Sequence, residues 1–432
     1  MPSYQWIQYS TARQQLALRL ADPNNVFWTD TENGYYICEA LRTFNALTEI
    51  WNGTLAFQAT PAQTWYNISQ LAGSPRLRTL TDSYLYTGMQ YHLLEPPTAS
   101  TWTGTSQFSI ADLSGALERR RDEMIQAVGC NLDQLPAIPS VPNTRRTYLP
   151  DSTLEPRRAR FISADSSTIV TMTREDTLAW NAFESQRLQT WKVPQAWSVI
   201  SGPPQAMDVD TSPNVPGKYD VICLRSGPRF LPPVSALLGV PDDWSWLAKW
   251  GALADLLGRD SEATDRQRAD YCLKRFTDGL EIMKQSNWLL TATINGVVVD
   301  TPSLREMDGF FPEWETNANA WPTVVTAGID FLAACPVAPL TGVSCVVVGN
   351  APIPVFDTDF VEVGRDVFDA ILDYAQVLAS FKMGGQEFMD TQDLEKNFFR
   401  VALENNKRLS KLAIFSDMLH LEGRRQDINQ PR

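Results

Sequence analysis

Histidine is the side chain that most often acts as a general base near neutral pH, and this chain contains only two, His92 and His420. His92 stands between Tyr91 and Leu93, and its apolar neighbours favour a structural histidine over a catalytic one. His420 lies in a basic C-terminal stretch, where we expect it to face solvent. The histidines therefore predict no general-base catalysis.

The motifs that hold phosphates, zinc or a serine nucleophile are missing from the sequence. It has no G-x-x-x-x-G-K-S/T loop, no H-E-x-x-H, no G-x-S-x-G and no Cys/His zinc spacing. Asp357-Thr358-Asp359 begins like a calcium loop, but it lacks the glycine and the distal glutamate of such a loop, so a capped turn is favoured. We expect no catalytic residue, no cofactor and no metal ligand.

Paired carboxylates are the alternative route to catalysis, because two of them at the right separation can hydrolyse a glycosidic bond. Asp208 with Asp210, and Glu313, are candidates. With 50 acidic residues in the chain, however, some carboxylates must lie near each other by chance. The prediction is that the chain is not an enzyme.

The formal net charge of −13 argues against non-specific binding to nucleic acid. An acidic wall would suit a DNA conduit, because an attractive wall would retain the DNA. The alternative is that the acidic surface only keeps the protein soluble. Any contact with DNA is therefore expected to be local or transient.

Length and composition indicate a globular chain with more than one core. It has 432 residues, of which 44% are hydrophobic and 20% charged. Its six cysteines form no CxxC pair, which is typical of a reduced protein with small buried thiols. The N-terminus lacks a signal-peptide pattern, and no apolar stretch is long enough for a membrane span.

The periodicity predicts an α+β fold of helical-hairpin modules with inserted β domains. In the N-terminal part, Thr29-Asp30-Thr31-Glu32 forms a capping-box pattern before an apolar helical stripe. Further on, Asn295-Gly296 separates two valine-rich runs, as in a tight β-hairpin. The expected regions are a mostly helical region 1–134, a Pro-rich linker 135–156, a β-rich insert 157–228, a helical block 229–285, a β-hairpin-containing segment 286–360, a second helical block 361–415 and a flexible tail 416–432.

The two late helical blocks look duplicated. Asp242-Asp243-Trp244 aligns with Asp366-Val367-Phe368, and Trp250 then meets Tyr374. The alternative is that any two amphipathic helix pairs align this well. A helical hairpin cannot bury its apolar face alone, so such blocks would pack on each other or on neighbouring subunits in a ring.

Large aromatics and arginines are the candidate interface residues, since both are enriched where proteins meet. The alternative for each aromatic is a place in the chain's own core. For the arginine clusters, including 119–121 on a helix, the alternative is a solvated face. The candidates are Trp244, Trp246, Trp250, Phe368, Tyr374, Arg157 and Arg158.

Several segments in these helical blocks and near the N-terminus resemble those of tailed-phage virion proteins. They are LLGVPDDW (237–244), KWGALADLLG (249–258), RADYC (268–272), VGRD (363–366), ILDYA (371–375), FKMGG (381–385) and EALRT (39–43). In style, the blocks are similar to phage neck adaptors, the head–tail connector proteins. The motifs are helix-packing motifs, and they carry no chemistry.

The resemblance implies a structural virion protein that joins the portal to the tail and braces the channel through which DNA is ejected. It implies a homo-oligomeric ring, usually of twelve copies, with portal, tail or nozzle proteins and tail fibres as partners. No membrane is expected. The β insert departs from a minimal adaptor and leaves the exact station in the neck or tail open. The alternative is a tail or fibre-anchoring protein whose insert binds another virion protein or a host glycan, with Trp180, Trp191 and Trp197 as glycan-stacking candidates.

Overall fold

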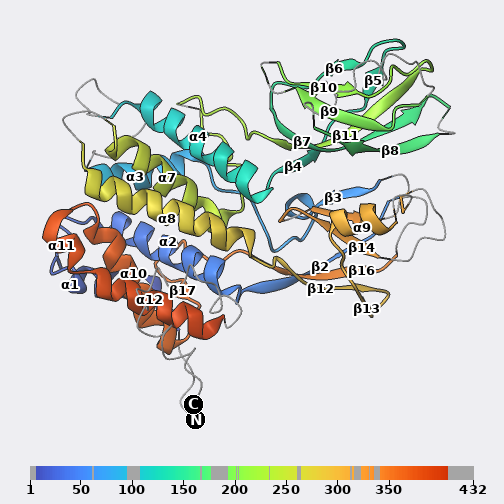
Figure 1. Cartoon of the computed structure of the whole chain (residues 1–432). Coiled ribbons are helices and arrows are strands. Elements are labelled where there is room, and N and C mark those ends of the chain that lie inside the picture. Colours follow the sequence, from blue (N-terminus) through green and yellow to red (C-terminus); the bar gives the residue numbers. More distant parts are fainter. Residues whose placement is uncertain are drawn as a thin grey trace, which may run out of the picture.

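The chain is a mixed α+β protein in the computed structural model, with helices and strands gathered into separate regions (Figure 1). The structure describes residues 6–406 except 61–62, 95–107, 166–167, 177–192, 201, 203, 233, 260–263, 312–313, 316–322, 330 and 335–340. One hydrophobic core joins the helices to two small sheets, and a second core lies inside a β module. No described helix is long and apolar enough to span a membrane.

The helices of the N-terminal part and of both late blocks form one helical body (Figure 1). Helix α2 packs against α1, α10 and α12, while α7 packs against α3, α4 and α8. The helices are α1 Tyr9–Arg19, α2 Asp30–Thr48, α3 Asp82–Leu93, α4 Ile110–Val128, α7 Ser245–Leu257, α8 Arg266–Lys284, α9 Leu304–Phe310, α10 Arg365–Ser380, α11 Gly385–Met389 and α12 Gln392–Asn405, with 3₁₀ turns η1 Ile68–Gln70 and η2 Asp242–Trp244.

Helix α2 begins where the sequence predicts, but only half of the expected capping box forms. The Thr29 side chain accepts a hydrogen bond from the backbone N–H of Glu32. The Glu32 carboxylate, which would bond back to the cap, instead accepts from Lys382 Nζ at 2.9 and 3.1 Å and from Tyr36 Oη at 2.7 Å. The carboxylate of Glu32 therefore binds the buried Lys382 of the second helical block and not the backbone of the N-cap residue.

Two small sheets combine strands from both ends of the chain. The predicted hairpin is confirmed: β12 pairs with β13 across Asn295 and Gly296, whose φ angles are +53° and +80°. The strand orders are β13-β12-β16-β2 and β14-β15-β3, and β1 pairs with β17 in a separate two-stranded sheet. The strands are β1 Ile7–Gln8, β2 Asn52–Phe57, β3 Trp65–Asn67, β12 Leu289–Ile294, β13 Val297–Val299, β14 Val324–Ala327, β15 Phe331–Ala334, β16 Val343–Val348 and β17 Phe360–Val361.

The β module is built on an eight-stranded sheet in the order β4-β11-β7-β8-β9-β10-β6, with β5 also paired to β11. Its strands are β4 Leu132–Gln134, β5 Ile138–Ser140, β6 Arg146–Tyr148, β7 Thr153–Ser163, β8 Ile169–Arg174, β9 Ala196–Ile200, β10 Ala206–Val209 and β11 Gly217–Arg225. The expectation of a linker at 135–156 is corrected here. The segment supplies β5 and β6, because later strands provide the backbone partners for its extended residues.

The two late helical blocks differ in detail. In the first, α7 and α8 pack directly on each other. In the second, α10 packs on α12, and the short helix α11 lies between them in sequence. Their duplication stays a prediction.

Candidate functional site

The five aromatic interface candidates lie in the chain's own core. Each is at most 4% exposed, and Trp244 stacks on Trp246 with ring centroids 6.1 Å apart. Tyr374 stacks on Phe398 at 4.2 Å. Of the two possibilities that the sequence leaves open for these aromatics, partner interface or the chain's own core, their burial favours the core. They line facing helices of one body, and the hydrophobic effect buries them within the chain. The five are Trp244, Trp246, Trp250, Phe368 and Tyr374.

The two arginine candidates, which are neighbours in β7, behave differently. Arg157 is exposed and pairs with Glu155 at 3.1 Å. Arg158 is 5% exposed and forms a bidentate pair with Asp308 of α9 at 2.9 and 3.0 Å. It also donates to buried Glu315 at 2.6 Å. The partner that Arg158 clamps is thus this chain's own α9 region, and it fastens the β module to the small sheets.

The remaining sequence candidates do not assemble into a reactive site among the described residues. Asp208 is held by a bidentate pair with Arg146, at 3.0 and 3.2 Å. Asp210 accepts hydrogen bonds from the backbone N–H groups of Gln195 and Thr211. Asp359 caps a turn, as expected, by accepting two backbone N–H groups at 2.8 Å. The residues Glu313, His420, Trp180 and Trp191 lie outside the described residues, while Trp197 is buried.

A buried network of three polar side chains lies inside the helical body. Lys249 of α7 is fully buried, pairs with Glu39 of α2, and lies 3.0 Å from Nε2 of His92 on α3. Burial lowers the pKa of Lys249 below its usual value, against the opposing effect of Glu39. Burial and the nearby Lys249 charge hold the pKa of His92 well below its usual value. The structural role expected for His92 fits this position.

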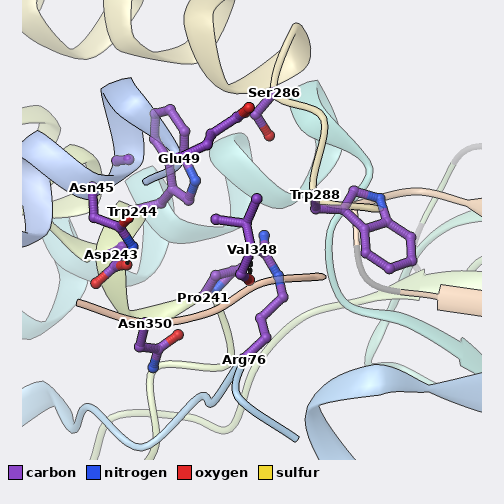
Figure 2. A pocket seen from close by; sticks show the side chains of 11 residues that line it. Asn45, Glu49, Arg76, Pro241, Asp243, Trp244, Ser286, Trp288, Val348 and Asn350 are labelled. Atoms are coloured by element: carbon purple, nitrogen blue, oxygen red, sulfur yellow. Dashed lines mark hydrogen bonds between the residues drawn. The ribbon is translucent and has the colours of Figure 1, made fainter. Parts of the chain in front are cut away.

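A second buried acid stands where the helices meet the four-stranded sheet, beside a small cavity shown in Figure 2. Asp243 accepts hydrogen bonds from the side-chain amide of Asn45 at 2.5 Å and from the backbone N–H of Ala351 at 3.0 Å. Burial raises the pKa of Asp243 to about 6, although Asn45 and the positive charge of Arg42 oppose this shift. The cavity measures about 10 Å³, which is close to the least that holds one water molecule.

A much larger cavity, of about 1090 Å³, opens between the β module and the rest of the chain, and we call it the inter-module cleft. From the β module it is lined by β4, by the end of β11 and by the two residues before β7, and from the rest of the chain by the end of β3, by η1 and by the loops before α3 and η2. The described lining residues are Asn67, Ser69, Gln70, Leu77, Arg78, Thr79, Asn131, Asp133, Asp151, Ser152, Arg225, Ser226, Gly227, Pro228, Arg229, Leu237 and Gly239.

One wall of the inter-module cleft is positioned by a buried arginine of α4. Arg121 is 1% exposed, donates to the Pro228 carbonyl at 2.6 Å and to Ser226 Oγ at 3.1 Å, and lies over the Phe230 ring at 4.4 Å. Gly227 leaves room for it, since a Cβ there would lie 2.8 Å from Arg121 Nη1. The sequence left two possibilities for the arginine cluster 119–121, a partner interface or a solvated face. Arg121 is instead buried, and its hydrogen bonds hold the 226–228 segment that lines the cleft.

The charges of the inter-module cleft are only partly compensated. Arg225 pairs with Asp133 at 2.6 Å, and Arg78 donates to the Gly239 carbonyl at 2.6 Å. In the part of the chain that the structure describes, neither Arg229 nor Asp151 forms an ion pair, and both residues are exposed. No sequence motif predicts the inter-module cleft, because its residues come from separate loops.

The inter-module cleft offers hydrogen bonds and charges to a ligand. The described lining residues include no histidine, lysine, cysteine or aromatic residue. Its walls therefore suit binding more than proton transfer or nucleophilic attack. Among the described residues, no group of three or more His, Cys, Asp or Glu side chains is placed to hold a metal ion. No protein-family model matches the chain, and no curated protein matches it.

Proposed function

We propose that the chain is a structural protein of a tailed-bacteriophage particle, located in the neck between the portal and the tail. The proposal starts from the resemblance of its helix-packing segments to phage virion proteins. The observation that supports it best is the contrast between the buried titratable groups and the open inter-module cleft. Lys249 and Asp243 are buried and cannot reach a ligand, whereas the inter-module cleft is lined by polar and charged side chains that can bind one.

A fixed arrangement of modules also fits a mechanical role. Arg158 fastens the β module to α9 through buried, charge-assisted hydrogen bonds. A subunit that transmits load between a head and a tail needs such fixed geometry. In this proposal the chain forms a homo-oligomeric ring, contacts portal and tail or nozzle proteins, and meets the genomic DNA only as it passes through the channel.

Imaging of the intact particle tests this proposal most directly. A specific antibody fragment against the full chain should decorate the neck in cryo-electron micrographs. Mixing the purified chain with portal rings should yield a larger species by light scattering. Decoration of tail tips would instead support the fibre-anchoring alternative, and a chain that is absent from purified particles would overturn both.

A further inference from the structure

His92 of α3 lies directly against a buried ammonium group. Its Nε2 is 3.0 Å from Nζ of Lys249, and both side chains are 0% exposed. Because an ammonium group only donates hydrogen bonds, this contact requires a neutral imidazole that accepts at Nε2. A protonated imidazole would donate at both nitrogens and would face the ammonium with a like charge in a poorly screened interior. The contact between His92 and Lys249 therefore exists only while His92 is neutral.

Both carboxylates of α2 that face this site already bind a lysine. Glu39 pairs with Lys249, and Glu32 pairs with Lys382, which lies just after α10. A protonated His92 would therefore have to share the Glu39 carboxylate with Lys249. It would gain no carboxylate of its own from the helix that packs against it.

The other titratable groups around the site add positive charge or no charge. Burial is the main reason that the pKa of His92 lies well below its usual value of 6.5. The charges of Lys249, Arg268 and Lys382 act in the same direction, and Arg275 of α8 acts likewise on Lys249. The remaining groups stay neutral near pH 6, because burial raises their pKa values. They are Tyr35, Tyr36, Tyr91 and Cys272.

The surroundings of the imidazole offer no acceptor for a second proton. Three aromatic rings pack against it, with the ring centroids of Tyr36, Trp250 and Phe381 at 5.5, 5.3 and 5.2 Å. Nδ1 of His92 has no hydrogen-bond partner among the described residues. A buried charge without hydrogen bonds is costly, so protonation of His92 must separate it from these neighbours.

The end of α3 is the part of this contact that can leave. Helix α2 also packs against α1, α10 and α12, and α7 also packs against α4 and α8. The start of α3 is held by Asp82, which accepts hydrogen bonds from the Ala236 backbone N–H at 2.9 Å and from Ser235 Oγ at 3.2 Å. His92 lies in the last turn of α3, at the other end from this anchor.

We propose that the last turns of α3, residues 88–94, form an acid-sensitive switch: neutral His92 holds them on Lys249 of α7, and uptake of one proton by His92 releases them from the helical body. No covalent bond changes, since a proton passes from solvent to Nε2 as its hydrogen bond to Lys249 breaks. This inference goes beyond the proposed function and does not depend on it.

The direction of the pH dependence follows from proton binding. The docked state binds fewer protons than the released state, because the pKa of His92 is below 6.5 only while it is buried. Docking is therefore fully present above about pH 6.5 and weakens as the pH falls. One proton is linked to release, so the ratio of released to docked α3 should rise about tenfold per pH unit.

Hydrogen exchange of the full chain, read by mass spectrometry between pH 7.5 and 5, measures this release. Labelling times are scaled to the intrinsic exchange rate at each pH. Protection of residues 88–94 should fall about tenfold per pH unit below about pH 6, while α12 keeps its protection. An equal loss of protection in α12 would show global unfolding and refute a local switch.

The two histidines of the sequence supply a variant and its matched control. His92→Gln keeps a side-chain oxygen that can accept from Lys249 but does not titrate, so it should abolish the pH dependence of residues 88–94. His420→Gln should leave that pH dependence as in the wild type. Unchanged pH dependence in His92→Gln, or its loss in His420→Gln, would overturn the proposal.

Nuclear magnetic resonance of the wild type with ¹⁵N-labelled histidine gives a readout that does not depend on how a variant folds. His420→Gln assigns the two imidazoles. The His92 nitrogens should keep the shifts of a neutral ring, protonated at Nδ1, until residues 88–94 lose protection. Protonation of His92 near pH 6.5 with unchanged protection of these residues would show that the buried site tolerates the charge, and the switch would be excluded.

Discussion

Lys249 Nζ lies 3.0 Å from Nε2 of His92, inside the helical body and out of contact with solvent. A lysine ammonium can only donate, so Nε2 accepts and the neutral histidine carries its proton on Nδ1. Glu39 supplies the opposite charge to the same ammonium. Three helices, α2, α3 and α7, are thereby tied together by one buried cation.

Removal of this buried cation should destabilise the chain strongly. Lys249→Met leaves the Glu39 carboxylate, which is 3% exposed, without its cation, and should lower the free energy of unfolding by about 3–5 kcal/mol. Urea denaturation followed by tryptophan fluorescence measures this. Lys284→Met is the control, because the Lys284–Glu281 pair is exposed and should change stability by less than about 1 kcal/mol.

The double variant Lys249→Met with Glu39→Gln separates the lost cation from a packing defect. It removes both charges, so most of the lost stability should return. A double variant that is no more stable than Lys249→Met would show that the methionine, and not the orphaned carboxylate, causes the loss.

Asp243 should make stability depend on pH in the direction opposite to that of most carboxylates. Burial raises the pKa of Asp243 to about 6 in the folded chain, whereas in the unfolded chain it has the ordinary value of 3.8. Between these two pH values the folded state therefore binds more protons than the unfolded state. The contribution of Asp243 is therefore fully present below about pH 3.8 and is lost as the pH rises through about 6. The shift corresponds to about 3 kcal/mol.

Comparison of the wild type with Asp243→Asn isolates this effect. The stability of the wild type relative to Asp243→Asn should decrease as the pH rises from 4 to 7, as measured by urea unfolding at each pH. Asp393→Asn is the control, since the salt bridge to Lys396 lowers the pKa of the Asp393 carboxyl and gives its contribution the opposite sign. A pH-independent difference for Asp243→Asn would contradict the prediction.

Local signals predicted local structure well. The Asn295-Gly296 turn and the Thr29 cap depend on residues within a few positions of each other, and both form. The proline-rich stretch 135–156 misled because proline is also compatible with an edge strand. Pro139 lies in β5, which among the described strands pairs with β11 alone, and its partner Lys218 is far along the chain.

Neither the buried Lys249 network nor the inter-module cleft was predictable from residue spacing, because the residues of each are remote in sequence. Lys249 and Glu39 are separated by 210 positions, and nothing near either residue signals the other. In the same way, Arg78, Asp151 and Arg229 meet only because the β module docks beside the helical body. The aromatic periodicity correctly marked buried helix faces, but periodicity cannot tell a core from an interface.

The hairpin turn offers a test of backbone strain. Gly296 has a φ of +80°, so Gly296→Ala should destabilise the chain by about 1 kcal/mol, because a Cβ disfavours this conformation. Gly309 of α9 has no positive φ and open space around it. Gly309→Ala should therefore stabilise by about 0.4–1 kcal/mol through reduced freedom of the unfolded chain. Thermal unfolding compares the two, and the same sign for both would refute the strain argument.

The adjacent arginines of β7 give the sharpest test of how the β module is held. The register of β7 against β11 shifts at Arg157, which lies at a β-bulge and is exposed, whereas Arg158 is buried and reaches Asp308 and Glu315. Arg158→Met leaves Glu315 with less charge compensation in a buried setting and removes the bidentate bond to α9. It should weaken module docking by about 3–5 kcal/mol, whereas Arg157→Met should change stability by less than about 0.5 kcal/mol.

Hydrogen exchange read by mass spectrometry distinguishes module opening from global unfolding. In Arg158→Met, amides of α9 and of β7 near the contact should exchange faster, while those of α2 and α7 in the helical body should keep wild-type protection. Uniformly faster exchange would show that Arg158 supports the whole fold and not the docking contact alone. Equal hydrogen exchange in Arg157→Met and Arg158→Met would show that Arg158 does not hold the β module against α9. The fixed geometry of the two modules, on which the inter-module cleft depends, would then have to come from other contacts.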